Sequence, residues 1–302
     1  MDFLYLLESI RLPGLNEFML AITYLGDEIA FLVVALILFW CVDKRQGYYV
    51  LCVGFFGTLA NQFLKITCQV PRPWVQDPEF TILEQAREAA TGYSFPSGHT
   101  TSAVGTFGCL AVVAERNWWR NLCIALAVLV GFSRMYVGVH TPADVLVGAA
   151  TALVLIWLLK KPTLDGGVRE MKGVIAAMVA VAVIFLLYVS FWTFPADMDP
   201  HNMESGTKNA YTMIGCLTGV AIVYLVDMKY LHFPEKAVWW VQIIKIVVGL
   251  LLVLAVKEGL RAPLELIMPV YPARAVRYFL IVVMAGAVWP MSFARLSKLG
   301  TK

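Results

Sequence analysis

The stretch that decides the fold is residues 65–144, which contains Lys65-Ile-Thr-Cys-Gln-Val-Pro-Arg72-Pro73, then Pro96-Ser97-Gly98-His99, then Ser133-Arg134-Met-Tyr-Val-Gly-Val-His140-Thr-Pro-Ala-Asp144. Each of these three motifs lies beside an apolar segment of helical length. Together they supply three cations, two histidines, a carboxylate and a Ser-Gly turn. If the segments bring these groups to one membrane face, the combination predicts a phosphate site with a nucleophile.

Composition indicates the class of protein. Of the 302 residues, 60% are hydrophobic and 15% are charged, and the mean hydropathy is +0.72. These values differ from those of soluble domains and are typical of a protein with several membrane helices. The net charge of +3 comes without a block of Lys or Arg, which argues against nucleic acid as a partner. The cysteines form no Cys-x-x-Cys pair, so they predict no metal site.

The apolar runs predict an all-α, polytopic transmembrane bundle of about nine spans, with eight as the alternative count. Residues 1–24 form an amphipathic segment that is expected to lie in the membrane interface. Residues 25–192 are expected to form the functional core, and residues 193–302 an extension of further membrane helices. The spans are expected at 25–42, 47–66, 98–115, 121–138, 143–160, 173–192, 209–227, 237–256 and 276–294.

The distribution of Lys and Arg indicates the orientation, because cytoplasmic loops are enriched in them. With the N-terminus outside, 13 of the 24 basic residues fall on the cytoplasmic side, namely Lys44, Arg45, Arg116, Arg120, Lys160, Lys161, Arg169, Lys172, Lys229, Lys236, Arg295, Lys298 and Lys302. All three motifs then fall on the opposite face. We therefore expect a multi-pass protein of the plasma or inner membrane whose site faces the extracytoplasmic or lumenal side.

The first two motifs have features of an anion site. Two prolines flank Arg72 and are expected to end the helix that carries Lys65, so that Arg72 lies on a turn. A snorkelling lysine and an interface arginine would give the same pattern. Ser97 and Gly98 open a helix, where free backbone N–H groups can bind an anion. Ser97 also fits an ordinary N-cap.

The third motif places Asp144 four residues after His140, which suits a nucleophile or base and its orienting carboxylate. The residues after His140 also fit a capping box that ends at Asp144, so this carboxylate can serve either purpose or both. Arg134 lies near the end of an apolar span, where a cation is costly unless it meets an anion. Asp27 could touch the site and Asn61 could face its cavity, but an interface carboxylate and an amide that bonds a neighbouring helix are the simpler interpretations.

In order and spacing, the three motifs resemble the signature of the type 2 phosphatidic acid phosphatase family, which shares its site with vanadium-dependent haloperoxidases. The pattern Lys-x6-Arg-Pro, Pro-Ser-Gly-His, Ser-Arg-x5-His-x3-Asp is present without a departure. The resemblance is specific over residues 65–144 and plausible in topology from about residue 17 to residue 192. It implies an integral membrane enzyme with a phosphatase core of this type.

The resemblance also implies a mechanism and a set of site residues. His140 would attack phosphorus and form a phosphohistidine, while Asp144 would hold its tautomer. His99 would protonate the leaving oxygen and then activate water. The residues expected to bind the phosphate oxygens are Lys65, Arg72, Ser97, Gly98 and Arg134. Neither a metal nor a cofactor is expected, because three cations supply the charge that a metal would provide.

The expected partners are the bilayer and a lipid substrate. The resemblance implies hydrolysis of a lipid phosphate or pyrophosphate, for example phosphatidate or a polyprenyl pyrophosphate such as undecaprenyl pyrophosphate. A lipid phosphotransferase that uses the same histidine and a non-catalytic membrane transporter are the alternatives. A vanadate haloperoxidase shares the residues, but those enzymes are soluble. The sequence makes no prediction of the oligomeric state.

Overall fold

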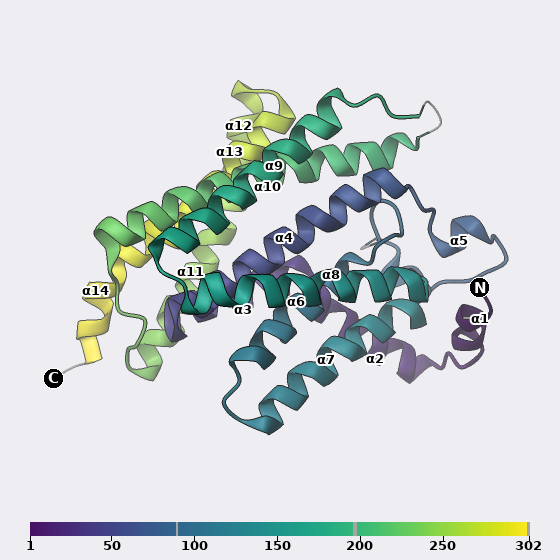
Figure 1. Cartoon of the computed structure of the whole chain (residues 1–302), viewed down its shortest axis with the longest axis horizontal. Helices are drawn as coiled ribbons and strands as arrows, with labels where there is room; N and C mark the ends of the chain where they lie inside the picture. Colours follow the sequence, from purple (N-terminus) through teal and green to yellow (C-terminus); the bar gives the residue numbers. More distant parts are fainter. Residues whose placement is uncertain (89, 196–197, 301–302) are drawn as a thin grey trace. The chain divides into compact units, whose positions relative to one another are not determined.

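The computed structural model describes residues 1–88, 90–195 and 198–300. Every regular element in these residues is a helix or a helical turn (Figure 1), which confirms the predicted all-α class. The remaining residues lie outside the described part of the chain; they are Ala89, Ala196, Asp197, Thr301 and Lys302. The last of these is one of the basic residues counted above for the cytoplasmic side.

The chain divides into two compact units, and the first contains the three motifs. Unit 1 comprises Met1–Leu32, Val50–Lys161 and Thr193–Gly206. Its elements are α1 (Asp2–Ser9), α2 (Pro13–Thr23), the 3-10 turn η1 (Tyr24–Gly26), the start of α3 (Glu28–Ile37), most of α4 (Lys44–Cys68), α5 (Pro73–Gln76), the 3-10 turn η3 (Glu84–Ala86), α6 (Gly98–Val113), α7 (Asn117–Tyr136) and α8 (Pro142–Lys160). Helix α6 packs against α7, α8 and η1, and α7 also contacts α1 and α2.

Helix ends in unit 1 follow from the local sequence. Ser97 is the N-cap of α6, and its hydroxyl accepts a hydrogen bond from the backbone N–H of Thr100. Thr141 and Asp144 form the predicted capping box of α8. Helix α4 ends at Cys68, and Arg72 has extended backbone angles (φ −67°, ψ 154°), as expected between two prolines. The polar residues of the motifs therefore lie at helix ends, where backbone groups are also available.

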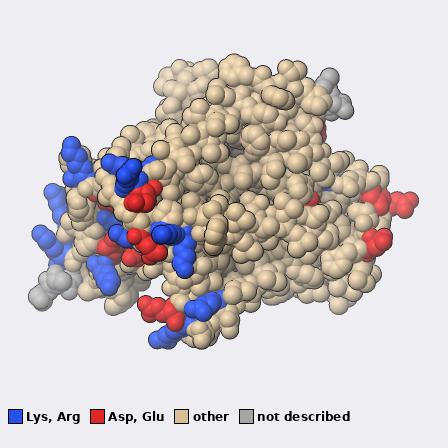
Figure 2. All heavy atoms as spheres, in the orientation of Figure 1, with Lys and Arg blue, Asp and Glu red and all other residues tan. Residues whose placement is uncertain are grey.

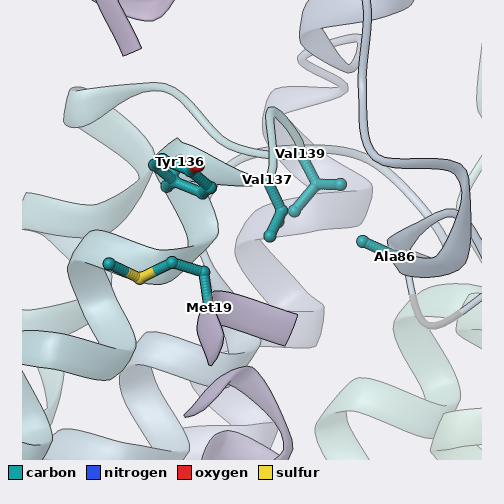
Figure 3. Close-up of a cluster of buried hydrophobic side chains, with 5 residues drawn as sticks. All are labelled: Met19, Ala86, Tyr136, Val137 and Val139. Carbon is teal, nitrogen blue, oxygen red and sulfur yellow. The ribbon is translucent and has the colours of Figure 1, made fainter. Parts of the chain in front are cut away.

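A hydrophobic cluster supports the turn between α7 and α8 (Figure 3). Its buried members are Met19, Ala86, Tyr136, Val137 and Val139. Three of these side chains come from the end of α7 and the turn that follows, and they pack with one side chain from α2 and one from η3. Burial of apolar side chains is the main force that fixes such a turn. It sets the backbone between Arg134 and His140.

Unit 2 comprises Val33–Tyr49, Pro162–Trp192 and Thr207–Lys302. Its elements are the rest of α3, the π-turn η2 (Leu38–Val42), most of the π-turn η4 (Lys161–Asp165), α9 (Val168–Phe191), most of α10 (Pro200–Val226), the π-turn η5 (Asp227–Leu231), α11 (Trp239–Gly259), α12 (Arg261–Ile267), α13 (Val270–Val283), the π-turn η6 (Met284–Val288), the 3-10 turn η7 (Trp289–Ser292), α14 (Phe293–Leu296) and the 3-10 turn η8 (Ser297–Gly300). Helix α11 contacts η2, α12, α13 and η6.

A cavity of about 340 Å³ lies beside the ion pair of Lys44 and Asp227, whose charged atoms are 2.7 Å apart.

Six helical segments are long and apolar enough to cross a membrane: Lys44–Gln76, Pro142–Asp165, Val168–Phe191, Pro200–Leu231, Trp239–Ile267 and Val270–Leu299. A seventh span results if Pro13–Gly26 and Glu28–Val42, which are bent by 54°, count as one. The predicted count of nine is therefore not confirmed. Two of the predicted spans correspond to α6 and α7. Helix α6 has only 16 residues, which span about 24 Å of a hydrocarbon core of roughly 30 Å, and α7 has polar residues at both ends.

Exposed apolar side chains accompany these segments. Helix α8 exposes Leu146 and Trp157, and α9 exposes Ile184 and Phe191. Charged side chains cover little of the face shown in Figure 2. Large apolar side chains directed outward are what a lipid-facing surface requires. The described residues thus confirm a multi-pass membrane protein.

Gly148 lets α8 approach the start of α6, and its replacement should be costly. A Cβ at this position would lie 2.7 Å from the backbone oxygen of Ser97. We expect Gly148→Ala to lower the free energy of unfolding by about 1–3 kcal/mol through overpacking. The matched control is Gly173→Ala in α9, where a Cβ meets nothing within 4 Å and alanine favours the helix. Thermal unfolding of the detergent-purified variants measures the difference, and equal midpoints would contradict this packing.

Candidate active site

His140 lies in the turn between α7 and α8 with both ring nitrogens engaged. Arg72 Nη1 is 3.0 Å from His140 Nε2, and His140 Nδ1 is 3.3 Å from Asp144 Oδ2. Because a guanidinium can only donate, Nε2 is the acceptor and Nδ1 carries the hydrogen. This tautomer leaves a lone pair on Nε2, which is the form of imidazole that can attack an electrophile.

The surroundings of His140 keep its ring neutral. The side chain is only 2% exposed. Burial lowers the pKa of His140 well below its ordinary value, and the positive charges of Arg72, Arg134 and Lys65 lower the pKa further. The imidazole is therefore unprotonated at neutral pH in the absence of an anion.

Asp144 accepts three hydrogen bonds at one carboxylate oxygen, Oδ2. The donors are the backbone N–H of Thr141 at 2.7 Å, the hydroxyl of Ser94 at 2.6 Å and His140 Nδ1 at 3.3 Å. The carboxylate thus caps α8 and orients the histidine at the same time. In addition, the backbone oxygen of Asp144 accepts a bond of 3.0 Å from the N–H of Ser97, which joins the starts of α8 and α6.

Arg72 uses its guanidinium to hold the loop that precedes α6. It donates to the backbone oxygens of Thr91 at 2.8 Å, Gly92 at 3.1 Å and Val139 at 3.0 Å. Lys65 Nζ donates to the same Thr91 oxygen at 3.3 Å. Gly92 has a φ of +68°, a conformation that favours glycine. The loop carbonyls and His140 together fix the orientation of Arg72.

Arg134 differs from Arg72, because much of its guanidinium has no protein partner. Its side chain is fully buried, and its Nη1 donates to Thr23 Oγ1 at 2.5 Å. Within the described part of the chain, Arg134 Nε and Nη2 are buried without a hydrogen-bond acceptor. A buried cation with unsatisfied donors is costly unless an anion binds it. Arg134 therefore favours the binding of an anion at this site.

His99 lies in the first turn of α6, close enough to Arg134 for the guanidinium charge to act on it. Its Nε2 is 3.6 Å from Asp27 Oδ1. Asn61 on α4 lies against the start of α6. Its Nδ2 donates to the backbone oxygen of Pro96 at 3.1 Å, and a Cβ at Gly98 would lie 3.4 Å from its Oδ1. Asn61 on α4 is thus bonded to the loop that leads into α6. Of the two interpretations of Asp27, the structure agrees with the one in which it approaches a predicted site residue.

All the residues singled out by the three motifs lie in unit 1, and the contacts above connect them through α4, α6, α7 and α8. The sequence did not single out Ser94, Thr23 or the carbonyl oxygens of Thr91 and Gly92. Ser94 precedes the second motif by two residues, and this closeness in sequence is the signal that could have identified it as a site residue. Among the described residues, no group of three or more His, Cys, Asp and Glu side chains is arranged to hold a metal ion.

Comparison with known sequences identifies the family of the chain. The pattern of the PAP2 superfamily matches residues 45–163, and the pattern described as "PAP2 superfamily phosphatase, transmembrane extension" matches residues 211–302. Phosphatidylglycerophosphatase B of Bacillus subtilis strain 168 is 33% identical over 168 residues, which cover 50% of this chain and 76% of that protein. The chain belongs to the PAP2 superfamily. This confirms the predicted family and enzyme class.

Two further relatives are named for a polyprenyl diphosphate and not for a glycerophospholipid phosphate. Undecaprenyl-diphosphatase BcrC of Bacillus subtilis strain 168 is 30% identical over 169 residues, 53% of this chain and 84% of that protein. An undecaprenyl-diphosphatase of Sulfolobus acidocaldarius is 27% identical over 168 residues, 55% of this chain and 80% of that protein. No solved structure gives a significant match. The superfamily match contains every residue of the three motifs and begins at residue 45, after Thr23 and Asp27.

Ser94 gives a prediction for this PAP2 phosphatase. Ser94→Ala removes the hydroxyl that donates to Asp144 Oδ2 at 2.6 Å, so the carboxylate should orient His140 less firmly. We expect kcat to fall by roughly 10- to 100-fold, the usual loss when an outer partner of a working histidine is removed. The control is Ser9→Ala, which removes an exposed hydroxyl at the end of α1. Equal kcat values for the two variants would contradict the prediction.

Proposed function

We propose that this PAP2 phosphatase hydrolyses a lipid phosphomonoester or diphosphate through a phosphohistidine on His140, at the extracytoplasmic face of the membrane. The observation that carries the proposal is the position of His140 Nε2. This nitrogen lies 3.0 Å from Arg72 Nη1, while Asp144 holds the opposite nitrogen of the ring. A nucleophile beside guanidinium donors is the arrangement that phosphoryl transfer requires.

In the first step, Nε2 of His140 attacks phosphorus and the bond from phosphorus to the leaving oxygen breaks. His99 gives a proton to that oxygen, so the product leaves as an alcohol or as a lipid monophosphate. Asp144 stabilises the positive charge that develops on His140. The phosphate oxygens are bound by Lys65, Arg72, Arg134, the hydroxyl of Ser97 and the N–H of Gly98.

In the second step, neutral His99 takes a proton from water, and the resulting hydroxide attacks the phosphohistidine. The bond from phosphorus to Nε2 breaks, inorganic phosphate leaves, and His140 returns to its neutral form. Arg134 matters in both steps, because Nε and Nη2 have no acceptor among the described residues. Three cations provide the charge for which other phosphatases use a metal, so we propose that the reaction needs no metal.

A lipid is the substrate class that fits best. The site residues lie at the ends of helices in a multi-pass membrane protein, where a phosphate group can enter while its apolar tail stays in the bilayer. The names of the relatives point to polyprenyl diphosphates and glycerophospholipid phosphates. We therefore propose a polyprenyl diphosphate, phosphatidate or a similar lipid. The excess of Lys and Arg in the loops of the opposite face supports an extracytoplasmic site.

Phosphate release by the detergent-purified protein tests the proposal. The panel contains polyprenyl diphosphate, phosphatidate, phosphatidylglycerophosphate and sphingoid phosphate. We expect release from at least one of them, in the presence of EDTA, with inhibition by vanadate because it adopts the geometry of five-coordinate phosphorus. Transfer of the phosphoryl group to an alcohol instead of water would indicate the phosphotransferase alternative. No release from any lipid would overturn the proposal.

A further inference from the structure

The first long helical segment breaks close to His99. Helix α2 and η1 end at Gly26, α3 begins at Glu28, and the two parts are bent by 54°. Asp27 is the residue at the break and has extended backbone angles (φ −67°, ψ 151°). A break of this kind frees backbone and side-chain groups in the middle of an apolar segment. Such breaks in membrane helices are frequent at functional sites.

The break packs directly on the backbone of the site. A Cβ added at Gly26 would lie 2.8 Å from the backbone oxygen of His99 and 2.8 Å from a methyl carbon of Val130. Four residues before the break, Thr23 accepts the 2.5 Å hydrogen bond from Arg134. The segment from Thr23 to Asp27 thus touches both His99 and Arg134. It lies outside the part of the chain that matches the superfamily pattern.

Asp27 is the acidic group that faces His99. The distance from Asp27 Oδ1 to His99 Nε2 is 3.6 Å, with 14% of the histidine and 37% of the aspartate side chain exposed. His99 Nε2 is buried and has no hydrogen-bond partner among the described residues. A modest movement of either side chain would close the pair, since catalytic hydrogen bonds often tighten when substrate binds.

Positive charge surrounds His99 on its other sides. Arg134 on α7, Lys65 on α4 and Arg72 on the turn before α5 all act on it, and His140 adds to them only when it is protonated. These groups disfavour an imidazolium, which is the form that must donate a proton to the leaving oxygen. A carboxylate beside Nε2 counteracts them.

We propose that Asp27 is a positioning residue for His99: it orients the imidazole and stabilises the imidazolium form that protonates the leaving oxygen. This proposal deepens the proposed function and rests on it. In the first step His99 gives its proton to the leaving oxygen, and in the second step it regains one from water. The Asp27 carboxylate stays ionised throughout. The N-terminal segment thereby completes a site that the superfamily pattern covers only in part.

The test compares Asp27→Asn with Glu17→Gln, which removes one exposed carboxylate from α2. With a lipid phosphomonoester, we expect Asp27→Asn to lower kcat by roughly 10- to 100-fold. The basic limb of its kcat–pH profile should move to lower pH, because loss of a negative charge favours neutral His99. With p-nitrophenyl phosphate, whose leaving group needs little protonation, the loss should be smaller. Asp27→Glu should recover part of the activity, and Glu17→Gln should behave as wild type.

A second measurement does not depend on turnover. Diethyl pyrocarbonate modifies neutral imidazole, so the pH midpoint of His99 modification, followed by peptide mass spectrometry, reports its protonation. We expect the midpoint to fall in Asp27→Asn and to stay unchanged in Glu17→Gln. An unchanged midpoint, or equal losses of kcat with both substrates, would overturn the role of Asp27. Failure of the wild type to release phosphate would overturn the proposed function, whatever the midpoint shows.

Discussion

His140→Ala is expected to abolish phosphate release, with a loss in kcat of about 10⁴-fold or more, because the attacking nitrogen is removed. The protein should still fold, since the turn that carries His140 is held by the hydrophobic cluster of Figure 3 and by the capping box of α8. Phosphate release and size-exclusion chromatography in detergent measure the two properties. A phosphoenzyme that is labile in acid should form in the wild type and be absent in this variant.

His201→Ala is the matched control, because it removes an exposed histidine on α10. It should leave kcat, KM and phosphoenzyme formation unchanged. His99→Ala provides a second comparison, since loss of water activation should slow the second step and let phosphoenzyme accumulate. If folded His140→Ala retained more than about 1% of wild-type kcat, another residue would be the nucleophile.

Arg134→Met should separate activity from stability. We expect kcat/KM to fall by about 10³- to 10⁵-fold, because a guanidinium that binds the transferred phosphoryl group contributes that much. The midpoint of thermal unfolding without ligand should stay the same or rise. Arg134 is fully buried, two of its nitrogens lack an acceptor among the residues that the structure describes, and an apolar side chain of similar size removes that cost.

Arg72→Met is the comparison for Arg134→Met. It should lose both activity and stability, because Arg72 donates to the backbone oxygens of Thr91, Gly92 and Val139. Val139 is buried, so its oxygen would be left without a donor, which is costly. Added vanadate should raise the unfolding midpoint of the wild type but not that of Arg134→Met. Equal destabilisation by the two substitutions would show that Arg134 is held by the protein and not reserved for an anion.

The two arginines show that the free-energy cost of burying a guanidinium depends on the acceptors around it. Arg72 lies outside a helix interior, between two prolines, and its surroundings satisfy it. Arg134 lies in the last turn of α7, and its Nε and Nη2 have no acceptor among the described residues. The burial of Arg134 is therefore not offset by hydrogen bonds to the extent that the burial of Arg72 is. Binding of a phosphate removes that cost, which is a direct source of affinity for the charged headgroup.

The sequence by itself determined the helical membrane class, the three motifs and most of the helix ends beside them. Apolar runs, the prolines that flank Arg72, and the capping box from Thr141 to Asp144 act within a few residues of the chain. Local steric and hydrogen-bonding rules are therefore enough to predict them. The predicted count of nine spans is not confirmed, because hydropathy does not distinguish a helix that crosses the bilayer from a short one such as α6, which packs against α7, α8 and η1.

Only the tertiary structure decided which other groups meet the motifs. Thr23 contacts Arg134 across 111 residues of sequence, and Ser94 contacts Asp144 across 50. Asp27 reaches His99 because the first long segment bends by 54° at that residue. The local sequence around a polar side chain in an apolar segment does not predict which residue it will contact, because that contact depends on how the helices pack. Packing depends on many side chains at once. It brings Thr23, Asp27 and Ser94 to the motif residues and so supplies the rest of the hydrogen bonds and charges of the site.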